Sequence, residues 1–243
     1  MITAAVIAKD EERHIAACLH TMSWADERLV LDSGSADRTR ELALEAGARV
    51  ELRAFDDFPH QRNAALALAQ HDWVLFVDAD ERVTPELAAE CQRTVVDRAE
   101  HAGYFIPRFN RIFGKVIRHA GWYPDYQMRL LDRRRARYDV RVPVHEVVQL
   151  DHGQAGYLRE HFIHYNYDSV AQFLAKQRRY SALEARRLST EGNVRYRSLL
   201  SMPVREFARR YWTLEGYRDG AHGLLLSALM AYFTFETYRQ CVS

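Results

Sequence analysis

The first ninety or so residues alternate between short apolar runs and amphipathic segments, and this alternation restricts the chain to an α/β fold. The apolar runs predict four buried strands, at Ile2–Ala8, Arg28–Leu31, Ala48–Leu52 and Trp73–Val77. Helical spacing of apolar residues predicts helices at Glu11–Met22, Asp37–Ala46, Pro59–Gln70 and Pro85–Asp97. Strands that alternate with helices over short connections pair in parallel through right-handed crossovers. We therefore expect a Rossmann-like, mixed but mainly parallel sheet with flanking helices.

The pattern changes after this region. Between Gly103 and His164, short strand-like runs are separated by turns rich in Gly, Pro and Arg, which predicts strands that close the sheet and loops that contact substrate. Helical periodicity returns after Asp168, where Val204, Phe207, Ala208, Tyr211 and Trp212 form one apolar stripe. Gly220 and Gly223 are expected to separate this helix from the last one. We predict a catalytic domain over residues 1–164 and a helical extension over residues 165–243.

The charge balance argues against a nucleic-acid-binding protein, because 34 Lys and Arg face 33 Asp and Glu. The predicted extension is basic and aromatic, whereas the rest of the chain is acidic, which indicates different tasks for the two parts. Three distant cysteines predict neither a disulfide framework nor a zinc site. With no basic segment leading into a long apolar core at the N-terminus, we expect a cytoplasmic protein.

Polar side chains follow three of the predicted parallel strands, where ligands bind in sheets of this kind. Asp78-Ala79-Asp80 directly follows a buried strand. Two carboxylates one residue apart can direct oxygens at one Mg²⁺ or Mn²⁺ that also binds substrate phosphates. The alternative is a solvated turn with helix-capping acids. Asp32 ends the second strand and favours a ligand contact, and Arg62 offers a fork of donors suited to phosphate, with a surface arginine as the alternative.

Together with neighbouring motifs, these residues resemble a known family of proteins. The resemblance rests on the motifs Asp10-Glu11-Glu12, Cys18-Leu19, Trp24-Ala25-Asp26-Glu27, Asp32-Ser33-Gly34-Ser35, Gln61-Arg62-Asn63 and Asp78-Ala79-Asp80-Glu81. Their order and spacing resemble the family 2 inverting glycosyltransferases of GT-A fold, and most of all the bacterial lipopolysaccharide-core β-glucosyltransferases. The similarity continues more loosely through Gly121-Trp122-Tyr123-Pro124-Asp125 and Val144-His145-Glu146. One departure is Asp10, where that family more often has Asn.

The resemblance implies a nucleotide-sugar donor, most simply UDP-linked, and a divalent metal, Mg²⁺ or Mn²⁺. By matching position, Ala8 and Glu11 line the nucleoside pocket, Asp32 binds the base and Arg62 approaches the diphosphate. Asp78, with Ala79 beside it, touches the ribose or the metal. Asp80 is the direct metal ligand.

An inverting transfer needs a carboxylate that takes the proton of the acceptor hydroxyl. In the resembled family this base follows the metal motif, which leaves two candidates here, Glu146 and Asp125. We prefer Glu146, whose alternative role is an ion pair with one of the arginines between Arg133 and Arg141. His164 follows an apolar strand and is a candidate further metal ligand, although a lone histidine is more often structural.

The sequence as a whole therefore predicts transfer of a sugar, glucose from UDP-glucose in the first instance, to a lipid-linked saccharide such as lipopolysaccharide core. Basic residues after Asp168 and the apolar run Gly223–Phe235 favour contact with the cytoplasmic face of the inner membrane, with a buried helix or a homodimer interface as alternatives. Two other functions remain open. They are a nucleotidyltransferase, against which the acidic loop Lys9–Glu12 argues, and a glycan- or nucleotide-binding module without turnover.

Overall fold

The computed structural model describes residues 1–97, 101–141, 147–151, 153–191 and 198–242. These residues form two compact units, Met1–Arg108 with Tyr126–His164, and Phe109–Asp125 with Tyr165–Ser243. The predicted division into residues 1–164 and 165–243 stays a prediction; in the structure, Phe109–Asp125 belongs to the unit that contains the C-terminal residues. The two units are described separately below.

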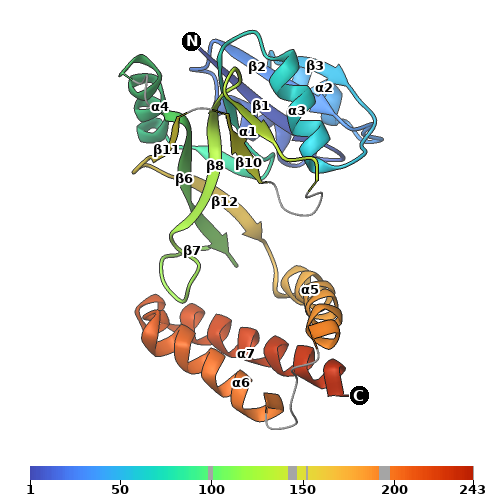
Figure 1. Cartoon of the computed structure of the whole chain (residues 1–243), viewed down its shortest axis with the longest axis vertical. Coiled ribbons are helices and arrows are strands. Elements are labelled where there is room, and N and C mark those ends of the chain that lie inside the picture. Colours follow the sequence, from blue (N-terminus) through green and yellow to red (C-terminus); the bar gives the residue numbers. More distant parts are fainter. Residues whose placement is uncertain (98–100, 142–146, 152, 192–197, 243) are drawn as a thin grey trace. The chain divides into compact units, whose positions relative to one another are not determined.

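The first unit is an α/β structure (Figure 1). Its strands are β1 (Ile2–Ala8), β2 (Glu27–Asp32), β3 (Arg49–Leu52), β4 (Trp73–Phe76), β5 (Glu81–Val83), β9 (Ala136–Tyr138), β10 (Val148–Leu150) and β11 (Gln154–Tyr157). Its helices are α1 (Ile15–His20), α2 (Thr39–Glu45), α3 (Phe58–Leu68) and α4 (Pro85–Asp97). Three further strands begin in one unit and end in the other: β6 (His101–Ile112), β8 (Asp125–Asp132) and β12 (Phe162–Tyr167).

The strands of the large sheet follow the order β3-β2-β1-β4-β8-β6-β12-β5. Neighbours from β3 to β4 are parallel, and β8 then pairs antiparallel with β4. The register places Ala8 opposite Asp32, so the carboxyl ends of β1 and β2 lie together. The expected α/β class, with a helical region at the C-terminus, is confirmed.

Alternation along the central strands explains why both faces of this sheet are covered. Ala4 and Val6 of β1 belong to one apolar core with residues of α1, α2 and α4. Ala5 of β1 points the other way and packs in a second core with Ala65 and Leu66 of α3. A strand that is buried on both faces needs an uninterrupted apolar sequence, which is the pattern that Ile2–Ala8 shows.

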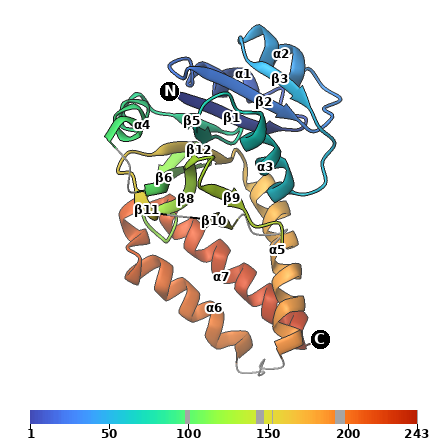
Figure 2. The same ribbon diagram turned by 45° about the horizontal axis from the view of Figure 1, so that its top comes forward.

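The second unit contains the strand β7 (Lys115–Ile117), which Figure 1 labels. Its helices are α5 (Val170–Glu191), α6 (Ser198–Ala208) and α7 (Ala221–Val242) (Figure 2). A π-helical turn at Arg209–Thr213 and a 3₁₀ turn at Gly216–Asp219 join α6 to α7. The core of this unit gathers Ile112, Ile117, Tyr167, Phe173, Leu226 and Phe233. No helix among the described residues is long and apolar enough to span a membrane.

The apolar stripe that begins on α6 and continues into the π-helical turn is partly exposed, since Val204 is 69% exposed and Trp212 60% exposed. One sequence expectation for the helical region is wrong. Gly223 does not separate two helices but lies inside α7, where a Cβ atom would meet the carbonyl oxygen of Gly216 at 1.8 Å. A close approach of two backbones therefore requires this glycine. Gly220 does precede α7, with a φ of 65°.

Candidate active site

The loops that follow β1 and β2 are joined by their own polar groups. The backbone N–H of Asp10 donates to Ser35 Oγ at 2.9 Å, and the N–H of Ala36 donates to Asp10 Oδ1 at 2.8 Å. The N–H of Glu11 donates to Thr39 Oγ1 at 2.7 Å. Asp10 has a φ of 55°, in the left-handed region that Asn and Asp enter more readily than other side chains. An aspartate can thus replace the asparagine that is more common at this position.

Asp32, the predicted base contact, is fully buried beneath this loop. Its Oδ1 accepts the N–H groups of Gly34 at 3.0 Å and Ser35 at 2.9 Å, and its Oδ2 accepts the Ser35 hydroxyl. Gly34 has a φ of 86°, which a side chain would strain. In this structure the carboxylate of Asp32 holds the loop in shape, and its contact with a base stays a prediction.

Ala8 and Gln61 hold the same loop from below. The carbonyl oxygen of Ala8 accepts the N–H of Ser33 at 2.8 Å. The side-chain amide of the buried Gln61 donates to Ser33 Oγ at 2.8 Å and to the carbonyl of Arg53 at 3.1 Å. Ala8 itself is only 2% exposed. If it shapes the nucleoside pocket as predicted, it would do so by supporting this loop.

Three guanidinium groups surround the carboxylate of Asp78. Arg62 donates to Oδ1 at 3.0 Å, Arg129 donates to Oδ2, and Arg108 Nη1 lies 4.0 Å from Oδ2. Burial alone would raise the pKa of Asp78, but the charges of Arg129, Arg62 and Arg108 outweigh burial and hold this pKa well below the usual range. Asp78 is therefore ionised at neutral pH and already neutralised by protein cations.

A second acid completes this arginine cluster. Glu81 is fully buried, and its carboxylate accepts from Arg108 Nη1 at 3.0 Å and from the backbone N–H of Asp78 at 3.0 Å. The guanidinium of Arg62 also stacks over the rings of Phe76 at 5.1 Å and Tyr138 at 5.6 Å. Three guanidinium groups thus meet Asp78 and Glu81 in one place, and guanidinium groups are well suited to bind a diphosphate.

Sequence reasoning missed Arg108 and Arg129, which lie on β6 and β8. Both side chains are largely buried, at 14% and 4% exposed. In the sequence, Arg108 directly follows Phe105-Ile106-Pro107, and Arg129 directly follows Tyr126-Gln127-Met128. Both tripeptides are mostly apolar. A charged residue within a half-buried strand is the signal that could have identified them.

Asp80 turns away from the arginine cluster and meets His164. The two residues lie 3.3 Å apart, between Asp80 Oδ2 and His164 Nε2, with side chains 37% and 10% exposed. The pairing of β5 with β12 explains the approach, because His164 lies opposite Glu81 in the register. A carboxylate oxygen and an imidazole nitrogen are both suitable ligands for Mn²⁺, and the carboxylate for Mg²⁺.

The Glu11 side chain lies close enough to several carboxylates, Asp80 among them, for their charges to act on it. Burial of the Glu11 side chain, followed by the charges of Asp80 and Asp37, raises the pKa of Glu11 to about 7. The ligand atoms of Glu11, Asp80 and His164 do not all come within 4.8 Å of one another, so the pair formed by Asp80 and His164 is the part of this region that fits a divalent metal. Ala79, between the two aspartates, is 4% exposed.

The two candidate bases are resolved differently. Glu146 lies outside the described residues, so its role stays a prediction. Asp125 begins β8 and belongs to the second unit, where the Asn110 amide lies 3.4 Å from its Oδ2. The structure does not assign either carboxylate to a substrate hydroxyl.

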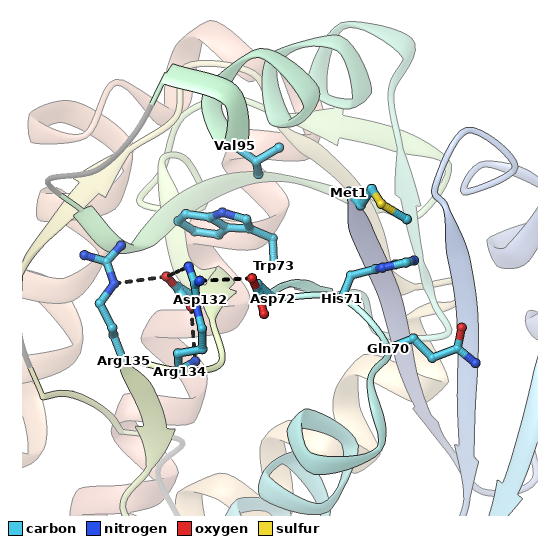
Figure 3. Close-up of a pocket in the computed structure, with 9 residues that line it drawn as sticks. All are labelled: Met1, Gln70, His71, Asp72, Trp73, Val95, Asp132, Arg134 and Arg135. Atoms are coloured by element: carbon cyan, nitrogen blue, oxygen red, sulfur yellow. Dashed lines mark hydrogen bonds and ion pairs between the residues drawn. The ribbon is translucent and has the colours of Figure 1, made fainter.

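Two other features do not belong to this site. A pocket of about 720 Å³ lies at the amino ends of β1 and β4, the edge opposite the loops described above (Figure 3). Asp132 lies in it, ion-paired with Arg134 and Arg135. Asp56, Asp57 and His60 bring three ligand atoms within 4.8 Å of one another, but Asp57 caps α3 and Asp56 pairs with Arg53.

Known proteins provide an independent comparison. LpsC of Rhizobium meliloti, named a lipopolysaccharide core biosynthesis glycosyltransferase, is 25% identical over 97% of this chain and 90% of its own length. A TPR repeat-containing protein of Synechococcus elongatus is 34% identical over 60% of this chain, which spans only 35% of that relative. Glucosyl-3-phosphoglycerate synthase of Mycobacterium tuberculosis, solved with Mn²⁺, UDP and glucosyl-3-phosphoglycerate, is 25% identical over 46% of this chain and 44% of its own, with a TM-score of 0.40.

The match to a family model covers a larger, continuous part of the chain. The model named Glycosyl transferase family 2 matches residues 3–165, more than half of the sequence. This region contains the arginine cluster, the Asp80–His164 pair and both loops at the carboxyl ends of β1 and β2. The chain therefore belongs to glycosyl transferase family 2.

Proposed function

We propose that this chain is a metal-dependent inverting glycosyltransferase that moves a sugar from a nucleoside-diphosphate donor, UDP-glucose in the first instance, to a hydroxyl of a lipid-linked saccharide. The proposal rests on two neighbouring groups of side chains after β4, one that can bind a cation and one that is rich in arginine. Asp80 and His164 offer ligands to a cation, while Arg62, Arg108 and Arg129 concentrate positive charge around Asp78. A diphosphate with a bound divalent cation needs both kinds of group.

Asp80 and His164 would hold the metal. Its positive charge would lower the pKa of Glu11, which the charge of Asp80 helps to raise. When bound, the cation neutralises charge on the diphosphate. Arg62, Arg108 and Arg129 provide fixed positive charge for the leaving group, and Asp78 with Glu81 keeps these guanidiniums in place. The predicted contact of Asp78 and Ala79 with the ribose would use the exposed third of the Asp78 side chain.

The chemical step is one in-line displacement at the anomeric carbon. The acceptor oxygen forms the new bond to that carbon as its bond to the diphosphate oxygen breaks, and the diphosphate keeps the electron pair. The hydroxyl proton passes to a carboxylate base, for which we propose Glu146, with Asp125 as the second choice. Asp32 would bind the base of the nucleotide, or would hold the loop that does so.

The test is release of UDP from UDP-glucose in the presence of Mn²⁺, compared with GDP- and dTDP-linked sugars and with chelator. Asp80→Asn should abolish the response to metal. Asp72→Asn is the matched control, because Asp72 lines the pocket at the opposite edge of the sheet. Full metal-dependent turnover by Asp80→Asn would contradict the assignment. Saturable donor binding without any hydrolysis or transfer would indicate a binding module instead.

We further propose that the helical unit contacts the cytoplasmic face of the inner membrane, where a lipid-linked acceptor would lie. This extends the prediction from the sequence to α6, on which Leu200 is 71% exposed and Val204 69% exposed, with the basic Arg205 next to Val204. Exposed apolar side chains beside a basic one suit an anionic lipid surface. Flotation of the protein with anionic but not with zwitterionic vesicles would support this contact. Sedimentation that shows a homodimer, together with quenching data that show Trp212 to be shielded in it, would oppose it.

A further inference from the structure

The second unit holds a pocket of its own, with a volume of about 270 Å³. Its walls are Asn110, Gly121, Trp122, Pro124, Asp125 and Asn166. These residues come from the end of β6, the loop before β8 and the end of β12. All six belong to the same unit, whereas Glu11, Arg62 and Asp80 belong to the other.

A chain of side-chain hydrogen bonds fixes the polar groups of this pocket. Asn110 is only 2% exposed, and its amide nitrogen donates to the carbonyl of Trp122 at 2.9 Å and lies 3.4 Å from Asp125 Oδ2. Its amide oxygen accepts from Asn166 Nδ2 at 3.0 Å, and Asn166 Oδ1 accepts from Lys176 Nζ at 3.4 Å. Because each partner can only donate or only accept, the orientations of both amides are determined.

Trp122, which also lines the pocket, is packed among aromatic and cationic neighbours. Trp122 packs edge-on against Tyr167, with ring centres 6.4 Å apart, and the guanidinium of Arg210 lies 5.7 Å from the centre of its ring. Gly121 has a φ of 77°, and a Cβ atom there would come within 2.9 Å of Leu214 Cδ1. A larger residue at this position would therefore disturb the wall of the pocket.

These walls match the chemistry of a sugar ring. A carboxylate accepts hydrogen bonds from hydroxyls, an amide both donates and accepts, and an aromatic ring with a proline packs against the C–H face of a pyranose. The volume lies just below the range of about 300–1,000 Å³ that larger ligands occupy, which suits one ring rather than an oligosaccharide. The carboxylate of Asp125 disfavours a phosphate.

We propose that this pocket binds one sugar ring of the acceptor. The proposal rests on the proposed function, in which the acceptor is a saccharide. The donor sugar is the other source of the same chemistry. We assign the acceptor because the residues proposed to hold the donor all lie in the first unit. Asn166 then contacts a hydroxyl of the acceptor, Asp125 accepts from one, and the buried Asn110 holds both side chains in place.

The experiment titrates the full-length chain with D-glucose, D-galactose, D-mannose and N-acetyl-D-glucosamine, with tryptophan fluorescence as the signal and NMR as a check. We expect at least one sugar to bind saturably. Asn166→Leu removes the amide at similar volume and should weaken binding about five- to tenfold, the effect of one lost hydrogen bond. Gln172→Leu, which removes an exposed amide of α5, is the matched control and should bind as the wild type does.

Asp125→Asn provides a second variant that keeps the shape of the pocket and loses its charge, and it should also weaken sugar binding. Melting curves confirm that each variant is folded. Equal affinities for the wild type, Asn166→Leu and Asp125→Asn overturn the proposal, as does the absence of binding for all four sugars.

Competition distinguishes the two sources of the sugar. If the acceptor fills the pocket, neither UDP nor UDP-glucose should displace the free sugar. Displacement by UDP-glucose and not by UDP would assign the pocket to the donor sugar and overturn the acceptor assignment. Release of UDP by the wild type is measured separately. Donor turnover without sugar binding refutes only the pocket, and sugar binding without donor turnover refutes only the proposed function.

Discussion

Replacing Asp78 by asparagine removes the charge that three arginines share. Arg62 and Arg129 are each 4% exposed and would keep their positive charges after losing the ion pair with Asp78. Removal of one partner from a fully buried ion pair costs about 3–5 kcal/mol. Because 34% of the Asp78 side chain is exposed, solvent screens part of this loss, and we expect about 2–3 kcal/mol.

Asp80→Asn is the matched comparison, since this carboxylate is two residues away and 37% exposed. Its contact with His164 predicts a loss of at most about 1 kcal/mol. Urea unfolding followed by tryptophan fluorescence measures both free energies. The pKa of Asp78 is lower in the folded than in the unfolded chain, so its contribution is present above an unfolded pKa of about 3.9 and is lost as the pH falls through the folded pKa. The gap between wild type and Asp78→Asn should therefore narrow below pH 4 or so.

The two variants should also separate in function. Asp80→Asn should lose the response of UDP release to Mn²⁺ while keeping its stability. If Asp78→Asn instead unfolds with wild-type stability and loses only the metal response, Asp78 is the metal ligand and the arginine cluster does not depend on it. Equal destabilisation by both substitutions would also refute the proposal that Asp78 holds the arginines while Asp80 binds the metal.

Three further predictions concern single side chains. Because the pKa of Glu11 is raised to about 7, the stability it contributes is present below its unfolded pKa and lost as the pH rises through 7. Glu11→Gln should therefore melt higher than wild type at pH 8 or so and equally near pH 4, both in chelator. Gly223→Ala forces two backbones apart at Gly216 and should cost about 3 kcal/mol or more, as circular dichroism melting would show. Burial raises the pKa of the Cys18 and Cys91 thiols, so neither should react readily with a disulfide reagent in the folded protein. The reagent should modify only Cys241 before urea is added and all three cysteines afterwards.

The parallel half of the sheet could be predicted because its signal is local. Ile2–Ala8 was expected and observed with the same bounds, and Trp73–Val77 differs from β4 by one residue. The other half depends on pairings that no window of sequence contains. β8 joins β4, and β12 joins β5 some 80 residues away, so neither the order of these strands nor the inclusion of Phe109–Asp125 in the helical unit follows from periodicity.

The helical region shows a different limit. An apolar stripe at helical spacing predicts a helix, and α6 confirms this part of the prediction. Spacing cannot tell whether the stripe packs inside the protein, because a core and an external partner require the same side chains. Leu200, Val204 and Trp212 are exposed in this structure.

The two carboxylates of the Asp78-Ala79-Asp80 triplet have different surroundings. The turn after β4 is closed by the N–H of Glu81 to the carbonyl of Asp78 at 2.9 Å, and by the N–H of Asp78 to the Glu81 carboxylate at 3.0 Å. Within this turn Asp78 faces the arginines and Asp80 faces His164. Since the arginines already neutralise Asp78, a cation at Asp80 would have few protein ligands. Mg²⁺ and Mn²⁺ bound in this way keep coordination positions for phosphate oxygens. Few protein ligands at the metal and ample positive charge beside it together favour a diphosphate over a free carboxylate or a neutral ligand.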